Sequence, residues 1–124
     1  MHELAVTKSI LDIAQRYARE HKASRVNTIF LRIGVLRNLE PEWLQRYFRF
    51  ISKGTIAEET EILVMLEPAV FECNSCQGQF SLELTQMSDD KVLCPSCAAR
   101  DYALVSGMEF EISGIEITEP EERL

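Results

Sequence analysis

The sequence predicts an α+β fold in which two helices pack on a small sheet of about three strands, with an inserted all-β lobe. Three observations lead to this fold class. Two segments of the first half carry apolar residues at helical spacing, three segments have the pattern of strands, and two close cysteine pairs precede the third strand. The last strand needs a partner for its apolar face. We therefore expect it to return to the first sheet, which makes the cysteine segment an insertion.

The first helix is expected from about residue 6 to His21. Apolar residues recur every three or four positions, and charged residues fill the opposite side. The apolar residues are Val6, Ile10, Ile13, Ala14 and Tyr17, and the charged ones are Lys8, Asp12, Arg16 and Arg19. We interpret His21 as a surface residue that caps the helix end. The run Val26 to Ile33, closed by Gly34, then predicts a mostly buried strand.

The second helix is expected to begin near Pro41, which suits a first helical turn, and to end by Gly54. Apolar residues cover much of its circumference, and we expect all of them to belong to the core. The alternative is that an exposed part docks a partner or a second copy. These residues are Trp43, Leu44, Tyr47, Phe48, Phe50 and Ile51, whereas Arg46, Arg49 and Lys53 are expected to form a solvated face.

Two further strands are expected after the helices. Residues 62–66 form an apolar run that ends before Pro68, and residues 108–117, beginning at Met108, alternate between apolar and other residues. Ser113 and Gly114 interrupt that alternation in the manner of a β-bulge. We expect one lobe of residues 1–69 plus 106–118, an inserted lobe of residues 70–105, and a frayed acidic tail of residues 119–124.

Composition and charge restrict the class of protein. The 124 residues are 46% hydrophobic and 27% charged, which is typical of a globular chain. No apolar run is long enough to cross a membrane, and the N-terminus lacks a secretory signal pattern, so we expect a cytoplasmic protein. The net charge is −7, and residues 70–105 contain two Lys/Arg against five Asp/Glu. This acidity argues against nucleic acid as a partner of the cysteine segment.

The four cysteines form two CxxC pairs, Cys73 with Cys76 and Cys94 with Cys97, separated by 17 residues. Each pair places two thiolates on one tight turn, and a hairpin with a short strand at residues 80–84 can bring both pairs to one tetrahedral ion. The spacing predicts a Zn²⁺ site in a zinc-ribbon-like lobe, with no open position for catalysis. The alternatives are disulfides, unrelated thiols, or the iron site of a rubredoxin-like electron carrier.

The chain opens with Met1, His2 and Glu3. A histidine at position 2 is ordinarily a solvated terminal residue. Chemistry permits more, because a free terminal amine, deprotonated backbone amides and an imidazole supply nitrogen donors in a square plane that suits Ni(II) or Cu(II). The residues alone leave both interpretations open.

Several features occur together over about residues 1–118. They are the opening MHEL, the stretches IGVLRNLEPEW and KGTIAEETEI, the two CxxC pairs and the closing LVSGMEFEISGIEI. Their combination resembles the HypA/HybF family of nickel metallochaperones for hydrogenase maturation. The resemblance implies a nickel lobe beside a zinc lobe held by the four cysteines. The nickel ligands would be the His2 side chain, the Met1 amine and the backbone nitrogens of His2 and Glu3, with Glu3 in support.

The resemblance also implies a function. The chain would deliver Ni²⁺ to the large subunit of a [NiFe]-hydrogenase together with a nickel-insertion GTPase, with dimer formation as a further option. We expect no enzymatic activity, because the chain has neither a catalytic triad pattern nor a phosphate-binding loop. Some relatives carry histidine directly after a CxxC pair, where this chain has Gln77 and Ala98. The main alternative function is a zinc-ribbon module for protein interaction that has no role with nickel.

Overall fold

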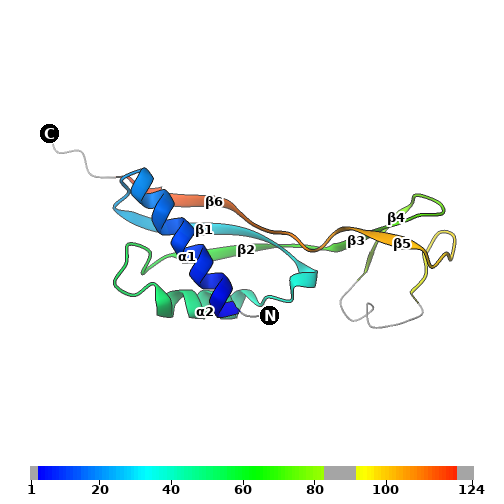
Figure 1. Cartoon of the computed structure of the whole chain (residues 1–124), viewed down its shortest axis with the longest axis horizontal. Helices are drawn as coiled ribbons and strands as arrows, with labels where there is room; N and C mark the ends of the chain where they lie inside the picture. Colours follow the sequence, from blue (N-terminus) through cyan, green and yellow to red (C-terminus); the bar gives the residue numbers. More distant parts are fainter. Residues whose placement is uncertain (1–2, 83–91, 120–124) are drawn as a thin grey trace. The chain divides into compact units, whose positions relative to one another are not determined.

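The structure, a computed structural model, describes residues 3–82 and 92–119, apart from the side chain of Glu3 (Figure 1). The described residues fall into two compact units. Residues 3–32, 39–65 and 111–119 form the α/β unit, and residues 33–38, 66–82 and 92–110 form the cysteine unit. The predictions for Met1, for His2, for the end of the 80–84 strand and for the tail from residue 120 concern positions outside the described residues.

Helix α1 (Glu3–Glu20) forms over the first predicted amphipathic segment. Its fully buried residues recur every three or four positions and are Thr7, Ile10, Ala14 and Ala18. The predicted stripe is wrong at Ile13, whose side chain is 45% exposed, and Leu11 is buried instead. Each residue turns the helix by about 100°, so Ile13 falls outside the arc that the buried residues share.

The end of α1 is a Schellman motif, in which a left-handed residue closes the last turn. Lys22 is that residue, with a φ of 53°, and the backbone N–H of Ala23 donates to the Ala18 carbonyl at 2.8 Å. His21 is exposed, and its backbone N–H donates to the Tyr17 carbonyl at 3.1 Å. The prediction of His21 as a surface residue at the helix end is confirmed.

Helix α2 (Pro41–Ile51) buries Leu44 and Phe48 completely. The prediction that all apolar residues of this helix are core is wrong, because Trp43 is 42% and Phe50 is 70% exposed. Leu44 and Phe48 lie four residues apart and share one side of the helix, so the neighbouring aromatic residues project elsewhere. In the part of the chain that the structure describes, neither helix is long and apolar enough to cross a membrane.

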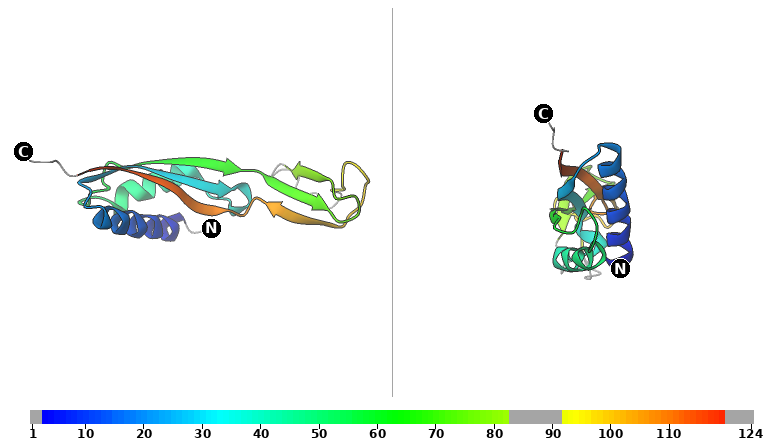
Figure 2. Two further views of the ribbon diagram at one scale, coloured as in Figure 1. Left: turned by 90° about the horizontal axis from the view of Figure 1, so that it is seen from above. Right: turned by 90° about the vertical axis from the view of Figure 1, so that its left-hand side faces the viewer.

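The first sheet contains β1 (Arg25–Gly34), β2 (Glu61–Glu67) and β6 (Phe110–Thr118) in the order β2-β1-β6. Residues on one face of β1, such as Ile29 and Leu31, are buried, whereas Met65 on β2 is 65% exposed. The helices therefore cover one face of the sheet (Figure 2). Since β6 pairs with β1, the predicted return of the last strand to the first sheet is confirmed.

Strand β6 begins at Phe110, so Met108 lies in the preceding turn and the predicted strand start is wrong by two residues. The Met108 carbonyl accepts a hydrogen bond from Arg37 Nε at 2.7 Å. Along β6, half-buried and exposed residues alternate until Gly114 and Ile115, which are both half-buried. This change of phase lies at the interruption that the sequence predicts.

The cysteine unit contains a second sheet, made of β3 (Ala69–Cys73), β4 (Gln79–Leu82) and β5 (Tyr102–Ser106). The order is β4-β3-β5, and both pairs are antiparallel. Phe71 lies opposite Phe80 in the register, with ring centres 5.9 Å apart, and Tyr102 meets both rings edge-on at 5.4 and 5.3 Å. These three rings form a small apolar core beside the cysteines.

A close crossing of backbone closes the base of the cysteine unit. Gly34 donates its N–H to the Glu109 carbonyl at 2.7 Å, and Leu36, in the short 3₁₀ helix η1 (Val35–Arg37), donates to the Gly107 carbonyl at 2.9 Å. A Cβ atom on Gly34 would lie 2.0 Å from the Gly107 carbonyl oxygen. Only glycine fits there, because no side-chain movement can relieve a clash with backbone.

The burial of α2 gives a first testable prediction. Phe48→Ala should lower the free energy of unfolding by about 3–5 kcal/mol, because it removes a fully buried ring and leaves a cavity. The matched variant Phe50→Ala should change it by less than about 0.5 kcal/mol, since that ring is 70% exposed. Urea unfolding of the two variants measures both effects. Equal losses would contradict the assigned orientation of α2.

The glycine crossing gives a second prediction. Gly34→Ala should lower the free energy of unfolding by about 1–3 kcal/mol or more, because the new methyl group overlaps the Gly107 carbonyl. Gly114→Ala is the matched control, since its Cβ would meet Phe30 Cδ2 at an ordinary 3.4 Å. Thermal unfolding of both variants tests this difference. A Gly34→Ala protein as stable as the unaltered chain would show that the crossing is looser than described.

Candidate metal centre

Each cysteine pair occupies a tight turn built in the same way. In the first turn, the N–H of Gln77 donates to the Cys73 carbonyl at 2.9 Å, and Cys73 donates to the Gly78 carbonyl at 2.9 Å. In the second, the N–H of Ala98 donates to the Cys94 carbonyl at 2.8 Å and Cys94 donates to the Ala99 carbonyl at 2.9 Å. The shared pattern orients both sulfur atoms of a pair toward the same point.

A left-handed residue follows the second cysteine of each pair. The φ angles of Gln77 and Ala98 are 60° and 62°, a conformation that costs a residue with a Cβ about 1–2 kcal/mol. Gly78 comes next in the first turn, where a Cβ would lie 3.3 Å from Cys76 Sγ. The turn therefore keeps backbone N–H groups close to sulfur at the expense of local strain.

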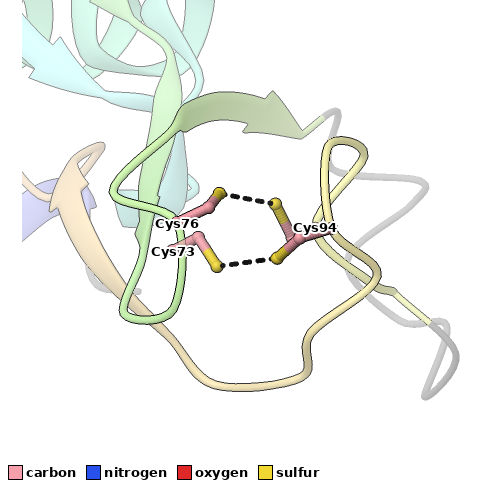
Figure 3. A group of neighbouring side chains, drawn as sticks. Cys73, Cys76 and Cys94 are labelled. Atoms are coloured by element: carbon pink, nitrogen blue, oxygen red, sulfur yellow. Dashed lines mark hydrogen bonds between the residues drawn. The ribbon is translucent and has the colours of Figure 1, made fainter.

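The four sulfur atoms gather at one point (Figure 3). The Sγ atoms of Cys73 and Cys97 are 3.5 Å apart, those of Cys76 and Cys94 are 3.7 Å apart, and all four lie within 4.8 Å of one another. A tetrahedral ion with bonds of about 2.3 Å to sulfur requires sulfur atoms about 3.8 Å apart. The predicted convergence of all four cysteines is confirmed. All four are free thiols, which excludes the disulfide alternative in this structure.

The pKa values of Cys73 and Cys97 are shifted in opposite directions. The backbone N–H of Cys76 and then that of Ser75, which lies 3.4 Å from Cys73 Sγ, outweigh burial and lower the pKa of Cys73 to about 6. The backbone N–H of Ala99 acts in the same direction on Cys97. At Cys97, however, the neighbouring thiols, Cys73 first, and burial outweigh this backbone N–H and raise the pKa of Cys97 to about 12. Four thiolates at this spacing repel one another, and a divalent cation removes that repulsion.

The burial of the cysteines and their number limit the chemistry that this site can perform. Cys73 and Cys94 are buried, while Cys76 and Cys97 are exposed. Four protein thiolates fill a tetrahedral ion, so no position is left to activate water. Such a donor set fits Zn²⁺ and also iron, because both accept four thiolates. The site can therefore hold a metal and stabilise the lobe, but it is not arranged for hydrolysis.

A pair of hydrogen bonds outside the cysteines joins the first cysteine turn to the segment before β5. Asn74 donates from its backbone N–H to the Asp101 carbonyl and from Nδ2 to Asp101 Oδ1, both at 2.9 Å. Asp101 directly precedes β5, so this contact ties the first cysteine turn to the strand beside β3. Reasoning from the sequence missed this pair and the N–H donors to sulfur. Gly78, two residues after Cys76, and Pro95, directly after Cys94, were the local signals of the two turns.

The predicted nickel ligands are not tested by the structure. Met1 and His2 lie outside the described residues, and Glu3 is the first residue of α1 with a side chain that is not described. Helix α1 thus begins at the third of the three residues that are predicted to supply nickel ligands. The assignment of nickel to this terminus stays a prediction.

Comparison with known proteins gives consistent matches over nearly the whole chain. Residues 1–117 match the family described as hydrogenase/urease nickel incorporation, metallochaperone, HypA. The hydrogenase maturation factor HypA of Aquifex aeolicus is 31% identical over 117 residues, covering 94% of this chain and 97% of the relative. The HypA of Chlorobium limicola is 35% identical over 119 residues, covering 96% and 98%.

Two solved structures share the fold. A solution structure of HypA protein superimposes with a TM-score of 0.69 at 17% identity, over 97% of this chain and 98% of the other. The solution structure of the Ni metallochaperone HypA from Helicobacter pylori gives a TM-score of 0.62 at 16% identity, over 97% and 100%. The predicted α+β fold with two helices, small sheets and a lobe built around four cysteines is confirmed.

The cysteine cluster predicts that the purified chain binds one zinc ion. Zinc removal, or Cys94→Ala, should unfold the sheet β4-β3-β5, since its three-ring core is too small to be stable alone. The helical signal of α1 and α2 should persist in circular dichroism. Ser96→Ala, in the same turn and exposed, is the control and should keep the metal. Cooperative loss of helix and sheet together would contradict independent units.

Proposed function

Because the chain belongs to the HypA family of hydrogenase and urease nickel-incorporation metallochaperones, we propose that it binds Ni²⁺ at its N-terminus and delivers the ion to the large subunit of a [NiFe]-hydrogenase. The family match over residues 1–117 carries this proposal, and the matched region includes the opening Met1-His2-Glu3. A nickel-insertion GTPase would act as the second partner in delivery.

The proposed nickel site uses nitrogen donors that the first three residues supply. The Met1 amine, the backbone nitrogens of His2 and Glu3 and the His2 imidazole can occupy a square plane, the geometry that suits Ni(II) with such donors. Glu3 would support the site through its side chain. The adjacent donors come from one short stretch of chain, so few groups must reorganise when the ion leaves. Release by ligand exchange requires no catalytic residue.

The two metals would then have separate tasks. We assign nickel to the α/β unit, at its N-terminus, and Zn²⁺ to the four cysteines of the cysteine unit. Zinc with four thiolates exchanges nothing with a substrate and serves stability, whereas nickel is cargo. We also propose that the protein acts in the cytoplasm. Dimer formation is compatible with each of these assignments.

A nickel titration tests the proposed terminal site. Ni²⁺ is titrated by calorimetry and visible absorption into zinc-loaded protein with a native N-terminus, into His2→Ala, and into a form with a short N-terminal extension. Both altered forms should lose tight binding and the absorption of square-planar Ni(II), because each removes a nitrogen donor. His21→Ala is the matched control, since His21 is the other histidine of the chain and is exposed at the end of α1.

The outcomes separate the proposal from its alternative. Unchanged binding in the extended form would rule out the Met1 amine as a ligand. Weak nickel binding by the native chain, with one zinc still bound, would favour a zinc-ribbon module for protein interaction. Loss of binding in His21→Ala alone would move the nickel site to the far end of α1.

A further inference from the structure

Helix α2 and the turn after it carry a row of aromatic and basic side chains, here called the α2 stripe, which is exposed except at the half-buried Tyr47. Residues three or four apart lie on one side of a helix. The stripe consists of Trp43, Arg46, Tyr47, Phe50 and Lys53. It lies apart from the buried Leu44 and Phe48, and α2 forms a margin of the α/β unit (Figure 1). No residue of the stripe is a proposed nickel or zinc ligand.

The side chains of the α2 stripe are ordered by one another. The rings of Trp43 and Tyr47 stack with their centres 5.7 Å apart, and Arg46 Cζ lies 4.9 Å from the centre of the Trp43 ring. Lys53 Nζ lies 5.7 Å from the centre of the Phe50 ring. These cation–π contacts hold charged groups beside apolar rings before any partner arrives. Less side-chain freedom is then lost on binding.

The exposed rings of Trp43 and Phe50 do not fill the core. Phe50 is 70% exposed and Trp43 is 42% exposed, although the core side of α2 is filled by other residues. Tryptophan, tyrosine and arginine are the residue types that contribute most to protein interfaces. We propose that the α2 stripe is a docking surface for an acidic, amphipathic segment of a partner protein.

Charge complementarity determines the chemistry of that segment. Arg46, Arg49 and Lys53 are exposed and can pair with carboxylates while an apolar side chain covers Phe50. Glu42 Oε1 already lies 3.4 Å from Arg46 Nη2, which shows that a carboxylate fits beside the stripe. Residues 1–69 contain ten Lys/Arg against nine Asp/Glu within a chain of net charge −7. An acidic segment is thus attracted to this part of the chain more than to the rest.

Other occupants fit these observations less well. Nucleic acid binds through many phosphate contacts, and the stripe with Arg49 offers three cations on an acidic chain. The proposal does not depend on nickel binding, because it uses none of the groups assigned to either metal. Its failure would leave the nickel titration unaffected, and failure of that titration would leave the stripe available.

A peptide selection tests the chemistry of the occupant. The zinc-loaded full chain serves as bait for a random peptide library, and the double variant Arg46→Glu, Arg49→Glu serves as parallel bait. The unaltered chain should enrich acidic peptides with spaced leucine or phenylalanine residues, and the variant should not. Enrichment of basic or uncharged peptides, or of the same peptides by both baits, would overturn the proposal.

Fluorescence then tests the place of binding. Trp43 is the only tryptophan of the chain, so a selected peptide without tryptophan can be followed through Trp43 emission. Binding should saturate, and Phe50→Ser or Arg49→Glu should raise the Kd about tenfold or more. Met65→Ser and Arg16→Glu are matched controls at exposed apolar and basic positions and should leave the Kd unchanged. Equal effects of the controls would overturn the proposal.

A competing occupant would be detected with the same variants. Phosphatidylserine vesicles and single-stranded DNA should not bind the chain in a manner that depends on Phe50 and Arg49. The chain alone should not self-associate through Phe50 when sedimentation is measured over a range of concentrations. Vesicle or DNA binding that depends on Phe50 and Arg49, or self-association through Phe50, would assign a different occupant to the α2 stripe and overturn the proposal.

Discussion

The convergence of four sulfur atoms is the constraint on which the cysteine unit depends. Four thiolates within 4.8 Å of one another repel, and a bound cation removes that repulsion. Around them the unit offers three packed rings and few other buried side chains. A core of this size does not stabilise a fold alone. The turns, the sheet β4-β3-β5 and the Asn74–Asp101 contact are therefore arranged around a metal.

The same constraint explains the local strain at the cysteine turns. Gln77 and Ala98 adopt left-handed conformations that favour glycine, and the turns gain N–H groups close to sulfur in return. These donors stabilise thiolate and so favour metal coordination. Left-handed residues also close α1 at Lys22 and follow η1 at Asn38, so this conformation is not confined to the cysteine turns. At the cysteine turns it additionally places N–H groups next to sulfur.

The proposed pair of metal sites, of opposite character, would suit a protein that transfers one ion. A site closed by four thiolates keeps its ion, since every coordination position is filled by the protein. A site built at a chain terminus exchanges its ion more readily, since local opening there disturbs little packing. The family to which the chain belongs incorporates nickel, and the proposed combination of a zinc site that keeps its ion with a nickel site that exchanges it is consistent with that task.

The sequence by itself determined the order of the elements and the convergence of the cysteines. Helical spacing located α1 and α2, apolar runs located β1 and β2, and alternation located β6. The two CxxC pairs, 17 residues apart, favoured a single shared ion over disulfides or unrelated thiols. These features are local, and periodicity or spacing encodes them directly. The return of β6 to β1 also followed, because an apolar strand face needs a partner.

Only the tertiary structure decided which apolar residues are buried and where strands begin. Ile13, Trp43 and Phe50 share the periodicity of core residues, yet the sheet covers a narrower arc of each helix than the apolar residues occupy. Strands β3 and β5 were not separately predicted, since their pairing depends on the cysteine cluster that brings distant segments together. Met108 lies outside β6, and its carbonyl accepts from Arg37, which is distant in the sequence. Contacts between residues far apart in the chain, which no local pattern records, made these decisions.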